Sequence, residues 1–274
     1  MAGLLFVCSC YNILMAYQWS RTKPYQPGQS EPYKVSRSKI DDFINCPRCF
    51  YLDRRLKIKK PDTPPFQINK AVDELLKKEF DSYRSKGKPH PLMSENGINA
   101  IPFAHESLDD WRENFVGVQF LHEQTNLLIF GAVDDIWVTD SGELIVVDYK
   151  ATAKKSEVSL DAPWQIAYKR QMEVYQWLLR QNGFNVSDIG YFVYCNGRLD
   201  LDGFNSRVEF KIKVIPYTGS DNWVEPTVYK LKECLESPEI PMNNAACEYC
   251  SYARSRMELT MQALRAKKQQ KLVQ

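Results

Sequence analysis

Two aspartates and a lysine in the middle of the chain have the residue types and the spacing of a divalent-cation site. Asp134 lies in the run LLIFGAVDDIWV, and Asp148 and Lys150 end the run ELIVVDYK. Both runs are rich in β-branched and aromatic residues, and TDSG between them is typical of a turn, so we predict a β-hairpin over residues 127–150. Because side chains alternate along a strand, Asp148 and Lys150 would share one face, and the hairpin would return Asp134 toward them.

Such a group suits Mg²⁺ or Mn²⁺, because two carboxylates provide hard oxygen ligands and leave positions for water and phosphate. The cation would lower the pKa of its bound water and polarise a phosphoryl oxygen, while Lys150 would orient the nucleophile or neutralise developing charge. The predicted chemistry is phosphodiester hydrolysis. The alternative is a buried strand whose polar end emerges into solvent.

A predicted helix over about residues 164–181 places two further polar side chains on one face. Gln171 and Tyr175 lie four positions apart within it, and an Asn-Gly pair follows as the C-terminal signal. The other predicted elements are a short helix from about Ser38 to near Pro47, a helix over about 69–84, strands within 116–124, 189–195 and 208–217, and a helix over 221–236. The mixture predicts an α/β fold.

Three short segments in this order resemble a known motif set. GAVD, DYK and QMEVY, which contain Asp134, Asp148, Lys150, Gln171 and Tyr175, resemble the G-x-x-D, D-x-K and Q-x-x-x-Y motifs of the RecB-like branch of the PD-(D/E)XK nuclease superfamily. The resemblance implies metal-dependent cleavage of DNA. Asp134 and Asp148 would be the metal ligands, Lys150 would stabilise charge or position water, and Gln171 and Tyr175 would shape the site.

The resemblance extends over about residues 36–255 and implies a restriction-endonuclease-like fold, with a mixed central sheet flanked by helices. In RecB-like relatives, the helix that corresponds to residues 69–84 often carries a metal-binding histidine, and this chain has Asp73 at that position. An aspartate there would either replace the histidine as an oxygen ligand or be a surface residue.

Two C-x-x-C pairs form a second candidate site, Cys46 and Cys49 in CPRC and Cys247 and Cys250 in CEYC. Four thiolates satisfy a tetrahedral Zn²⁺ or a 4Fe-4S cluster, and ordinary packing without metal is the third interpretation. The chain is similar here to the AddB-type and CRISPR adaptation nucleases, which carry a 4Fe-4S cluster on one upstream and three C-terminal cysteines. Residues 251–256 hold no cysteine, so Cys49 would supply the fourth sulfur. The remaining cysteines lack such partners and are predicted to pack as small apolar residues: Cys8, Cys10, Cys195 and Cys234.

The overall charge says little about partners, because 36 lysines and arginines face 34 aspartates and glutamates among 274 residues. A nucleic-acid surface must therefore be a local patch. One candidate is the basic stretch 46–60, with Phe50 and Tyr51 available to stack on bases, although a solvated helix face is equally compatible. Another is the long loop predicted over 86–102, as a substrate flap. Residues 256–274 are predicted to be a basic helical tail, with Lys267, Lys268 and Lys271.

The first 35 residues are predicted to be a disordered leader. Residues 1–16 are apolar but too short to span a bilayer, and they lack the basic start of a signal peptide. We therefore predict a cytoplasmic protein with no membrane partner, and Met15 as an alternative start. The paired cysteines fit a reducing compartment.

The predicted function is DNA cleavage in repair, recombination or CRISPR adaptation, on single-stranded DNA or DNA ends. A helicase or a CRISPR adaptation protein is a possible partner, and the sequence does not define the oligomeric state. The alternative is a catalytically inactive nucleic-acid-binding module of the same fold, which Asp73 in place of histidine would support. Hydrolysis of a non-nucleic substrate is a third possibility, for which the sequence shows no pocket signature.

Overall fold

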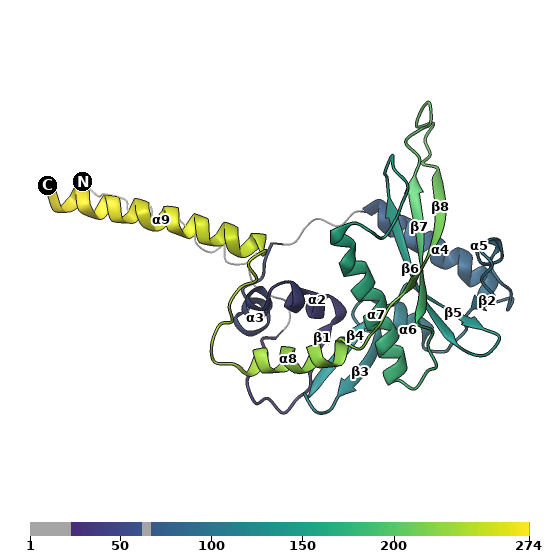
Figure 1. The fold of residues 1–274 in the computed structure, drawn as a ribbon, viewed down its shortest axis with the longest axis horizontal. Helices are drawn as coiled ribbons and strands as arrows, with labels where there is room; N and C mark the ends of the chain where they lie inside the picture. The colour runs from purple at the N-terminus through teal and green to yellow at the C-terminus, as the bar shows by residue number, and fades with distance from the viewer. Residues whose placement is uncertain (1–22, 62–66, 274) are drawn as a thin grey trace, which may run out of the picture. The chain divides into compact units, whose positions relative to one another are not determined.

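The computed structural model describes residues 23–61 and 67–273, which form two compact units (Figure 1). We call the described residues of 30–41 and 64–229 the sheet unit, and those of 1–29, 42–63 and 230–274 the cysteine unit. In chain order the elements are β1 (Tyr33–Ser36), α2 (Arg37–Asn45), α3 (Pro47–Leu56), α4 (Gln67–Arg84), α5 (Pro91–Glu95), β2 (Ala100–Pro102), α6 (Leu108–Arg112), β3 (Val118–His122), β4 (Leu127–Gly131), β5 (Asp135–Thr139), β6 (Leu144–Thr152), a 3₁₀ turn (Pro163–Gln165), α7 (Ile166–Gln181), β7 (Ile189–Gly197), β8 (Phe210–Thr218), α8 (Val224–Glu236) and α9 (Glu248–Val273).

Two mixed sheets form the sheet unit. The larger has the strand order β2-β5-β6-β7-β8, in which β6 and β7 are parallel and the other neighbours are antiparallel. Parallel neighbours need a crossover, and α7 provides it between β6 and β7. The smaller sheet has the order β1-β4-β3, with β1 parallel to β4. The predicted α/β fold with a mixed central sheet flanked by helices is confirmed.

The hairpin predicted over residues 127–150 is wrong in its first half. β4 ends at Gly131 and belongs to the smaller sheet, while β5 begins at Asp135 and pairs with β6 in the larger one. Asp134 therefore lies in the connection before β5 and not in the middle of a strand. An unbroken apolar run cannot show that its two halves pair with different partners, because both halves satisfy the same strand pattern.

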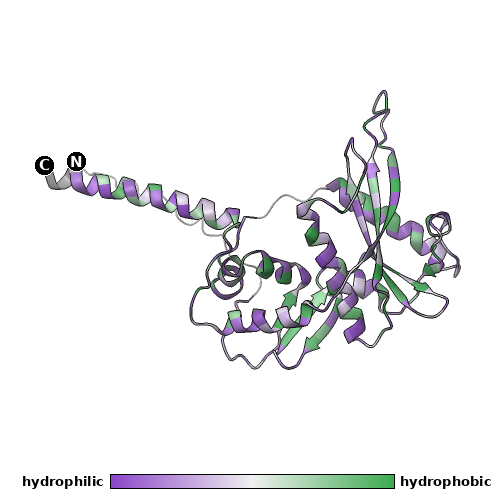
Figure 2. Cartoon of the chain, viewed as in Figure 1, coloured by the Kyte–Doolittle hydropathy of each residue, from purple (hydrophilic) through white to green (hydrophobic). Residues whose placement is uncertain are grey.

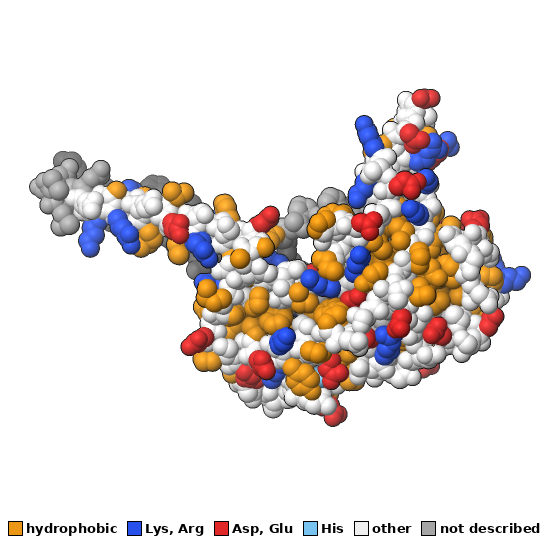
Figure 3. Space-filling view, viewed as in Figure 1, with side chains coloured by type: hydrophobic (Ala, Val, Ile, Leu, Met, Phe, Trp, Pro, Cys, Tyr) orange, Lys and Arg blue, Asp and Glu red, His pale blue; other side chains and the backbone are white. Residues whose placement is uncertain are grey.

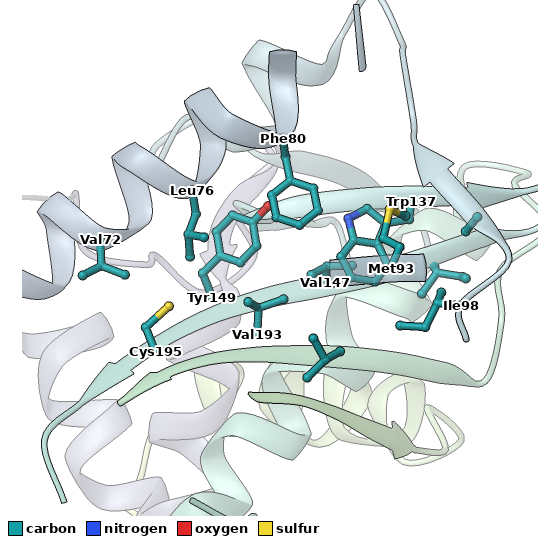
Figure 4. Packing of buried hydrophobic residues seen from close by; sticks show 13 residues of the cluster. Val72, Leu76, Phe80, Met93, Ile98, Trp137, Val147, Tyr149, Val193 and Cys195 are labelled. Carbon is teal, nitrogen blue, oxygen red and sulfur yellow. The ribbon is translucent and has the colours of Figure 1, made fainter. Parts of the chain in front are cut away.

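The core of the sheet unit lies between α4 and the larger sheet (Figure 4). Val72, Leu76 and Phe80 point from one face of α4 onto Trp137 and Tyr149, among other residues of β5, β6 and β7. The Phe80 ring stacks on the Trp137 ring with 5.6 Å between centroids and 15° between planes. The helix predicted over 69–84 is found at Gln67–Arg84, and its spacing of apolar residues does bury one face.

The flap predicted over residues 86–102 is also wrong. This segment contains α5 and β2, and the side chains of His90 and Met93 are buried. His90 stacks on Phe80 with 4.2 Å between ring centroids, and its Nδ1 accepts a hydrogen bond from the Leu92 amide at 3.1 Å. The prolines that indicated a loop include Pro91, which occupies the first turn of α5, where its missing N–H is not needed.

The cysteine unit is built on α3, and its packing corrects another prediction. Phe50 and Tyr51 lie on the buried face of α3, with only 1% and 3% of their surfaces exposed. Phe50 meets Phe43 edge to face at 5.4 Å, and the Tyr51 hydroxyl donates to the Ser237 carbonyl at 3.1 Å. Neither ring is therefore available to stack on a base. In contrast, the described side chains of α9 other than Cys250 are exposed, and hydrophilic and hydrophobic residues are mixed along the helix (Figure 2).

The disordered leader predicted over the first 35 residues is wrong where the structure describes it, because β1 begins at Tyr33 and the side chains of Tyr25 and Val35 are buried. The other predicted helices and strands lie close to their predicted positions. α2 begins at Arg37, one residue before the predicted cap, and α7, β7, β8 and α8 begin within about three residues of the predictions. α9 runs continuously through residues 255 and 256, where the tail was predicted to begin. Cys8, Cys10 and Met15 lie outside the described residues. Within the described ranges, no helix is both long and apolar enough to cross a bilayer.

Candidate functional site

The structure brings Asp134, Asp148 and Lys150 together at the start of β5 and on β6. Tyr149, between the last two, points into the core, and its backbone amide donates to Asp134 Oδ2 at 2.9 Å. On the opposite face of β6, the Lys150 ammonium forms an ion pair with Asp148 Oδ2. The alternation of β6 thus separates a structural tyrosine from a charged pair, as the sequence predicted.

The electrostatics of this group favour a bound cation. Burial and the nearby Asp148 carboxylate raise the pKa of Asp134 to about 6, although the Lys150 and Lys77 ammonium groups oppose the shift. Burial lowers the pKa of Lys150, but the Asp148 and Asp134 carboxylates outweigh this effect and raise it overall. Lys150 is therefore a cation, and an additional positive charge would relieve the repulsion between the two carboxylates.

Asp73 on α4 belongs to the same site. Its Oδ2 accepts from the Lys77 ammonium at 2.8 Å, while its Oδ1 is buried and has no hydrogen-bond partner. Burial and the Asp134 charge raise the pKa of Asp73. Asp148, whose side chain is fully buried, likewise has an Oδ1 without a hydrogen-bond partner. Buried carboxylate oxygens without partners are unusual, and those of Asp73 and Asp148 fit the oxygen ligands that Mg²⁺ and Mn²⁺ prefer.

Gln171 and Tyr175 reach the site from α7. Gln171 Nε2 donates to the Tyr175 hydroxyl at 3.0 Å, and the Lys150 ammonium donates to Gln171 Oε1 at 3.4 Å. The Tyr175 ring packs against Gly131, where an added Cβ would lie only 2.6 Å from Tyr175 Cε1. A glycine at the end of β4 is thus needed for Tyr175 to approach, which connects the G-x-x-D and Q-x-x-x-Y segments physically.

The sequence interpretation missed a buried charge network beside Asp134. Asp135 is fully buried, and its Oδ1 accepts from Arg84 Nη2 at 2.6 Å and from Arg112 Nη2 at 2.8 Å. Its Oδ2 accepts from the Tyr149 hydroxyl at 2.7 Å. The network fixes the start of β5 to α4, α6 and β6, and therefore holds Asp134 in place. The adjacent aspartates within an apolar run were a visible signal, but the two arginine partners were not.

The four paired cysteines converge in the cysteine unit. The Sγ–Sγ distances are 3.8 Å from Cys46 to Cys250, 3.6 Å from Cys49 to Cys247 and 3.5 Å from Cys49 to Cys250. Among the described residues, these thiols are the only group of three or more potential metal ligands whose ligand atoms all lie within 4.8 Å of one another. The donor set is soft and tetrahedral in number, as zinc or iron requires.

Local structure explains how the thiols meet. Cys46 caps the N-terminus of α3, and the second pair lies at the start of α9. Burial raises the pKa of Cys46, but backbone amides of Cys49 and Asn244 outweigh it and lower the pKa to about 7. Burial raises the pKa of Cys250 to about 11. Metal binding requires thiolates, so Cys46 is poised to ionise, whereas Cys250 would lose its proton on binding the metal.

Two described cysteines lie outside this group, and they differ in their surroundings. Cys195 is buried in the core beneath α4, as predicted for a small apolar residue. Cys234 on α8 is partly buried, and burial raises the pKa of both thiols to about 11. Neither belongs to the metal-binding group, which among the cysteines that the structure describes comprises the two C-x-x-C pairs.

Comparison with known proteins places the chain in a family. A family model for the PD-(D/E)XK nuclease superfamily matches residues 34–255. A solved structure described as "Crystal structure of SSO0001" is similar at 14% identity, over 82% of this chain and 86% of that one, with a TM-score of 0.35. No curated protein matches the chain. Because the family match spans most of the sequence, the chain belongs to the PD-(D/E)XK nuclease superfamily, which suggests a nuclease-type function.

Proposed function

We propose that this protein is a divalent-metal-dependent DNA nuclease of the RecB-like branch. The observation that carries the proposal is the buried Asp148, which faces the Lys150 ammonium with one oxygen and has no hydrogen-bond partner for the other. A buried carboxylate with an unsatisfied oxygen is expensive to maintain unless it has a ligand. The raised pKa of Asp134 beside it supports the same conclusion.

Asp134 and Asp148 would hold Mg²⁺ or Mn²⁺, with Asp73 as a further oxygen ligand. When bound, the cation supplies an activated water and polarises the scissile phosphoryl group. Lys150 keeps its charge beside Asp148 and can neutralise the negative charge that builds on the phosphoryl oxygens. Gln171, held by the Tyr175 hydroxyl, restricts where the ammonium can point.

The four-cysteine group would hold a structural cofactor. The family resemblance supports a 4Fe-4S cluster. The thiol spacing of 3.5–3.8 Å supports Zn²⁺, because four ligands at the usual Zn–S bond length lie about 3.8 Å apart at the corners of a tetrahedron. A cluster puts a separate iron at each thiol, so the thiols would have to move apart. Visible absorbance and elemental analysis of anaerobically purified protein distinguish the two cofactors.

The alternative function is nucleic-acid binding without cleavage. It would suit a member of the fold that had lost its catalytic side chains, and Asp73 in place of histidine is the one departure of that kind. The intact Asp148 and Lys150 pair favours catalysis instead. Repair, recombination and CRISPR adaptation are possible settings for the reaction, with a helicase or an adaptation protein as partner.

The test is cleavage of labelled single- and double-stranded DNA with Mg²⁺, Mn²⁺ or a chelator. We compare the wild type with Asp148→Ala, Lys150→Ala and the control Asp140→Ala, whose side chain is exposed on the β5–β6 turn. Metal-dependent cleavage that Asp148→Ala and Lys150→Ala abolish, and the control retains, supports the proposal. Equal cleavage by all four proteins overturns it, and wild-type binding without cleavage favours the alternative.

A further inference from the structure

A groove leads away from the carboxylate site across the sheet unit. A small pocket of about 240 Å³ is lined by Asp73 and Lys150. It shares Asn69, Ala151 and Tyr168 with a larger groove of about 900 Å³ that continues between the 3₁₀ turn and the β7–β8 hairpin. A ligand chain that reaches Asp73 and Lys150 can therefore continue into the groove without leaving the protein surface.

Two aromatic rings that line this groove, those of Tyr168 and Trp164, lie between two lysine side chains. The Lys150 ammonium lies 4.5 Å from the centroid of the Tyr168 ring, and the Tyr168 ring meets the Trp164 ring edge to face at 5.3 Å. The Lys154 ammonium lies 5.2 Å from the centroid of the Trp164 ring. Positive charges separated by flat rings complement a strand in which phosphates are separated by bases.

Trp164 is held firmly although half of it is exposed. Its side chain is 53% exposed, which leaves a large apolar surface in contact with water. The next residue, Gln165, is buried, and it accepts from the Ala162 amide at 2.8 Å and donates to the Ser159 carbonyl at 2.6 Å. The backbone around Trp164 is thus anchored from both sides, so the ring is presented to the groove at little cost in conformational entropy.

The charge around the groove suits an anionic strand. Lys154 forms no ion pair within the described ranges, so its charge is available to a ligand. Basic side chains extend along the projecting β7–β8 hairpin, interspersed with acidic ones (Figure 3). Two of these, Arg198 and Arg207, line the groove and are partly neutralised by Asp200 and Glu209. Lys150 is likewise paired with Asp148, so the positive charge that is available next to the exposed rings is that of Lys154.

We propose that this groove is a base-binding subsite, in which Trp164 stacks on an unpaired base of the DNA strand whose phosphate lies at Lys150. The proposal rests on the proposed nuclease function and adds the residue that selects the substrate. Within a duplex, each base is already stacked and paired, so its face is not free to lie on Trp164. A single strand or a frayed end can turn a base into the groove, with Lys154 against a neighbouring phosphate.

The test is binding by the full-length protein in the presence of a chelator, so that no DNA is cleaved. The probes are a labelled single strand, a strand of equal length with abasic sites in place of bases, and the corresponding duplex. The wild type should bind the base-bearing strand most tightly. Trp164→Ala should weaken that binding by about 5- to 150-fold, the usual range for the loss of one base-stacking contact, and should leave binding of the abasic strand unchanged.

Two variants distinguish stacking from damage to the fold. Trp164→Phe keeps a flat ring and should retain most of the affinity. Phe115→Ala removes a ring that is 79% exposed but does not line the groove, and it should bind as the wild type does. The proposal is overturned if Trp164→Ala binds the base-bearing strand normally, if it weakens both strands equally, or if the wild type does not distinguish them.

The failure of this subsite can be distinguished from the failure of the nuclease function. Asp148→Ala should lose cleavage in Mg²⁺ or Mn²⁺ and keep the preference for the base-bearing strand. A protein that cleaves DNA but shows no effect of Trp164→Ala retains the nuclease assignment and loses the subsite.

Discussion

The carboxylate site and the four-cysteine group are both candidate metal sites, but the chain builds them in different ways. The thiols come from two C-x-x-C pairs, each of which brings two ligands together through local helix geometry, and their sulfurs lie within 4.8 Å of one another. The carboxylates come from α4, from the connection before β5 and from β6, and two ammonium groups already lie among them. Local spacing thus forms each half of the four-cysteine group, and one tertiary contact joins the halves, whereas each carboxylate of the other site is placed separately by the tertiary fold.

This difference has a functional counterpart. Four thiolates complete the coordination of zinc and leave no position for a substrate, as in structural sites. The carboxylate site has unsatisfied oxygens, a nearby lysine and a groove that leads to it, as a site that admits a substrate requires. We therefore propose that the four-cysteine group stabilises the fold and that the carboxylate site carries the chemistry, and four variants or conditions test this division.

The largest expected effect is the loss of the cofactor from the cysteine unit. Replacing Cys49 and Cys250 with serine removes two of four thiolates from a type of site whose metal affinity is worth about 10–16 kcal/mol. Elemental analysis should find bound zinc or iron reduced to near background, and thermal unfolding should begin at a lower temperature. The control is Cys234→Ser, because Cys234 lies outside the group. Full metal content in the double variant would contradict the assignment.

The next effect concerns the network that positions the carboxylates. Asp135→Ala would leave the charges of Arg84 and Arg112 without their shared buried partner, and we expect the free energy of unfolding to fall by about 3–5 kcal/mol. Urea denaturation measures the change, with Asp140→Ala as the exposed control. If both variants were equally stable, the carboxylate site would not depend on this network.

A smaller effect is expected at Gly131. An alanine there would press its Cβ against the Tyr175 ring, and overpacking of this kind costs about 1–3 kcal/mol. DNA cleavage should fall as well, since Tyr175 holds Gln171. Gly203→Ala is the matched control for stability, because the nearest atoms to an added Cβ there are 3.9 Å away. Cleavage is compared with Asp140→Ala, because Gly203 lines the proposed groove. Unchanged stability and cleavage in Gly131→Ala would show that the contact with Tyr175 is dispensable.

The smallest expected effect is a pH dependence of the protein without divalent metal. Burial and Asp148 raise the pKa of Asp134 from 3.8 to about 6, so the folded chain binds this proton more tightly than the unfolded chain does. The free energy of unfolding should therefore fall as the pH rises from about 4 to about 6, and this contribution should level off above that range.

Thermal unfolding in a chelator across this pH range measures the effect. Asp134→Asn should remove the decrease, and saturating Mg²⁺ should reverse it, because the cation takes the place of the proton. A wild type and an Asp134→Asn variant with the same pH profile would show that Asp134 does not titrate in this range.

The features that the sequence predicted well depend on local geometry. Strand alternation placed Asp148 and Lys150 on one face, and helical spacing placed Gln171 beside Tyr175. The α/β class and the position of α4 followed from apolar periodicity. In each of these cases the residues lie within one strand or one helix. The period of the side chains, two residues in a strand and about four in a helix, is therefore sufficient to predict which of them share a face.

The features that the sequence did not predict depend on contacts between residues that are far apart in the chain. The break between β4 and β5 is determined by which strands pair, and the partners of Asp135 come from α4 and α6. Phe50 and Tyr51 were candidates for a nucleic-acid surface because basic residues surround them in the sequence, but both rings face inward. The roles of the site residues stay predictions, because geometry alone does not show chemistry.

The most direct test of the account is the binding of Mn²⁺ to the carboxylate site. Electron paramagnetic resonance of free Mn²⁺ gives the number of bound ions and their affinity for the wild type, the Asp134→Asn/Asp148→Asn double variant and the control Asp140→Asn. The account predicts that the double variant loses one Mn²⁺ site that the control retains, with its zinc or iron content unchanged. Equal Mn²⁺ binding by all three proteins would contradict it.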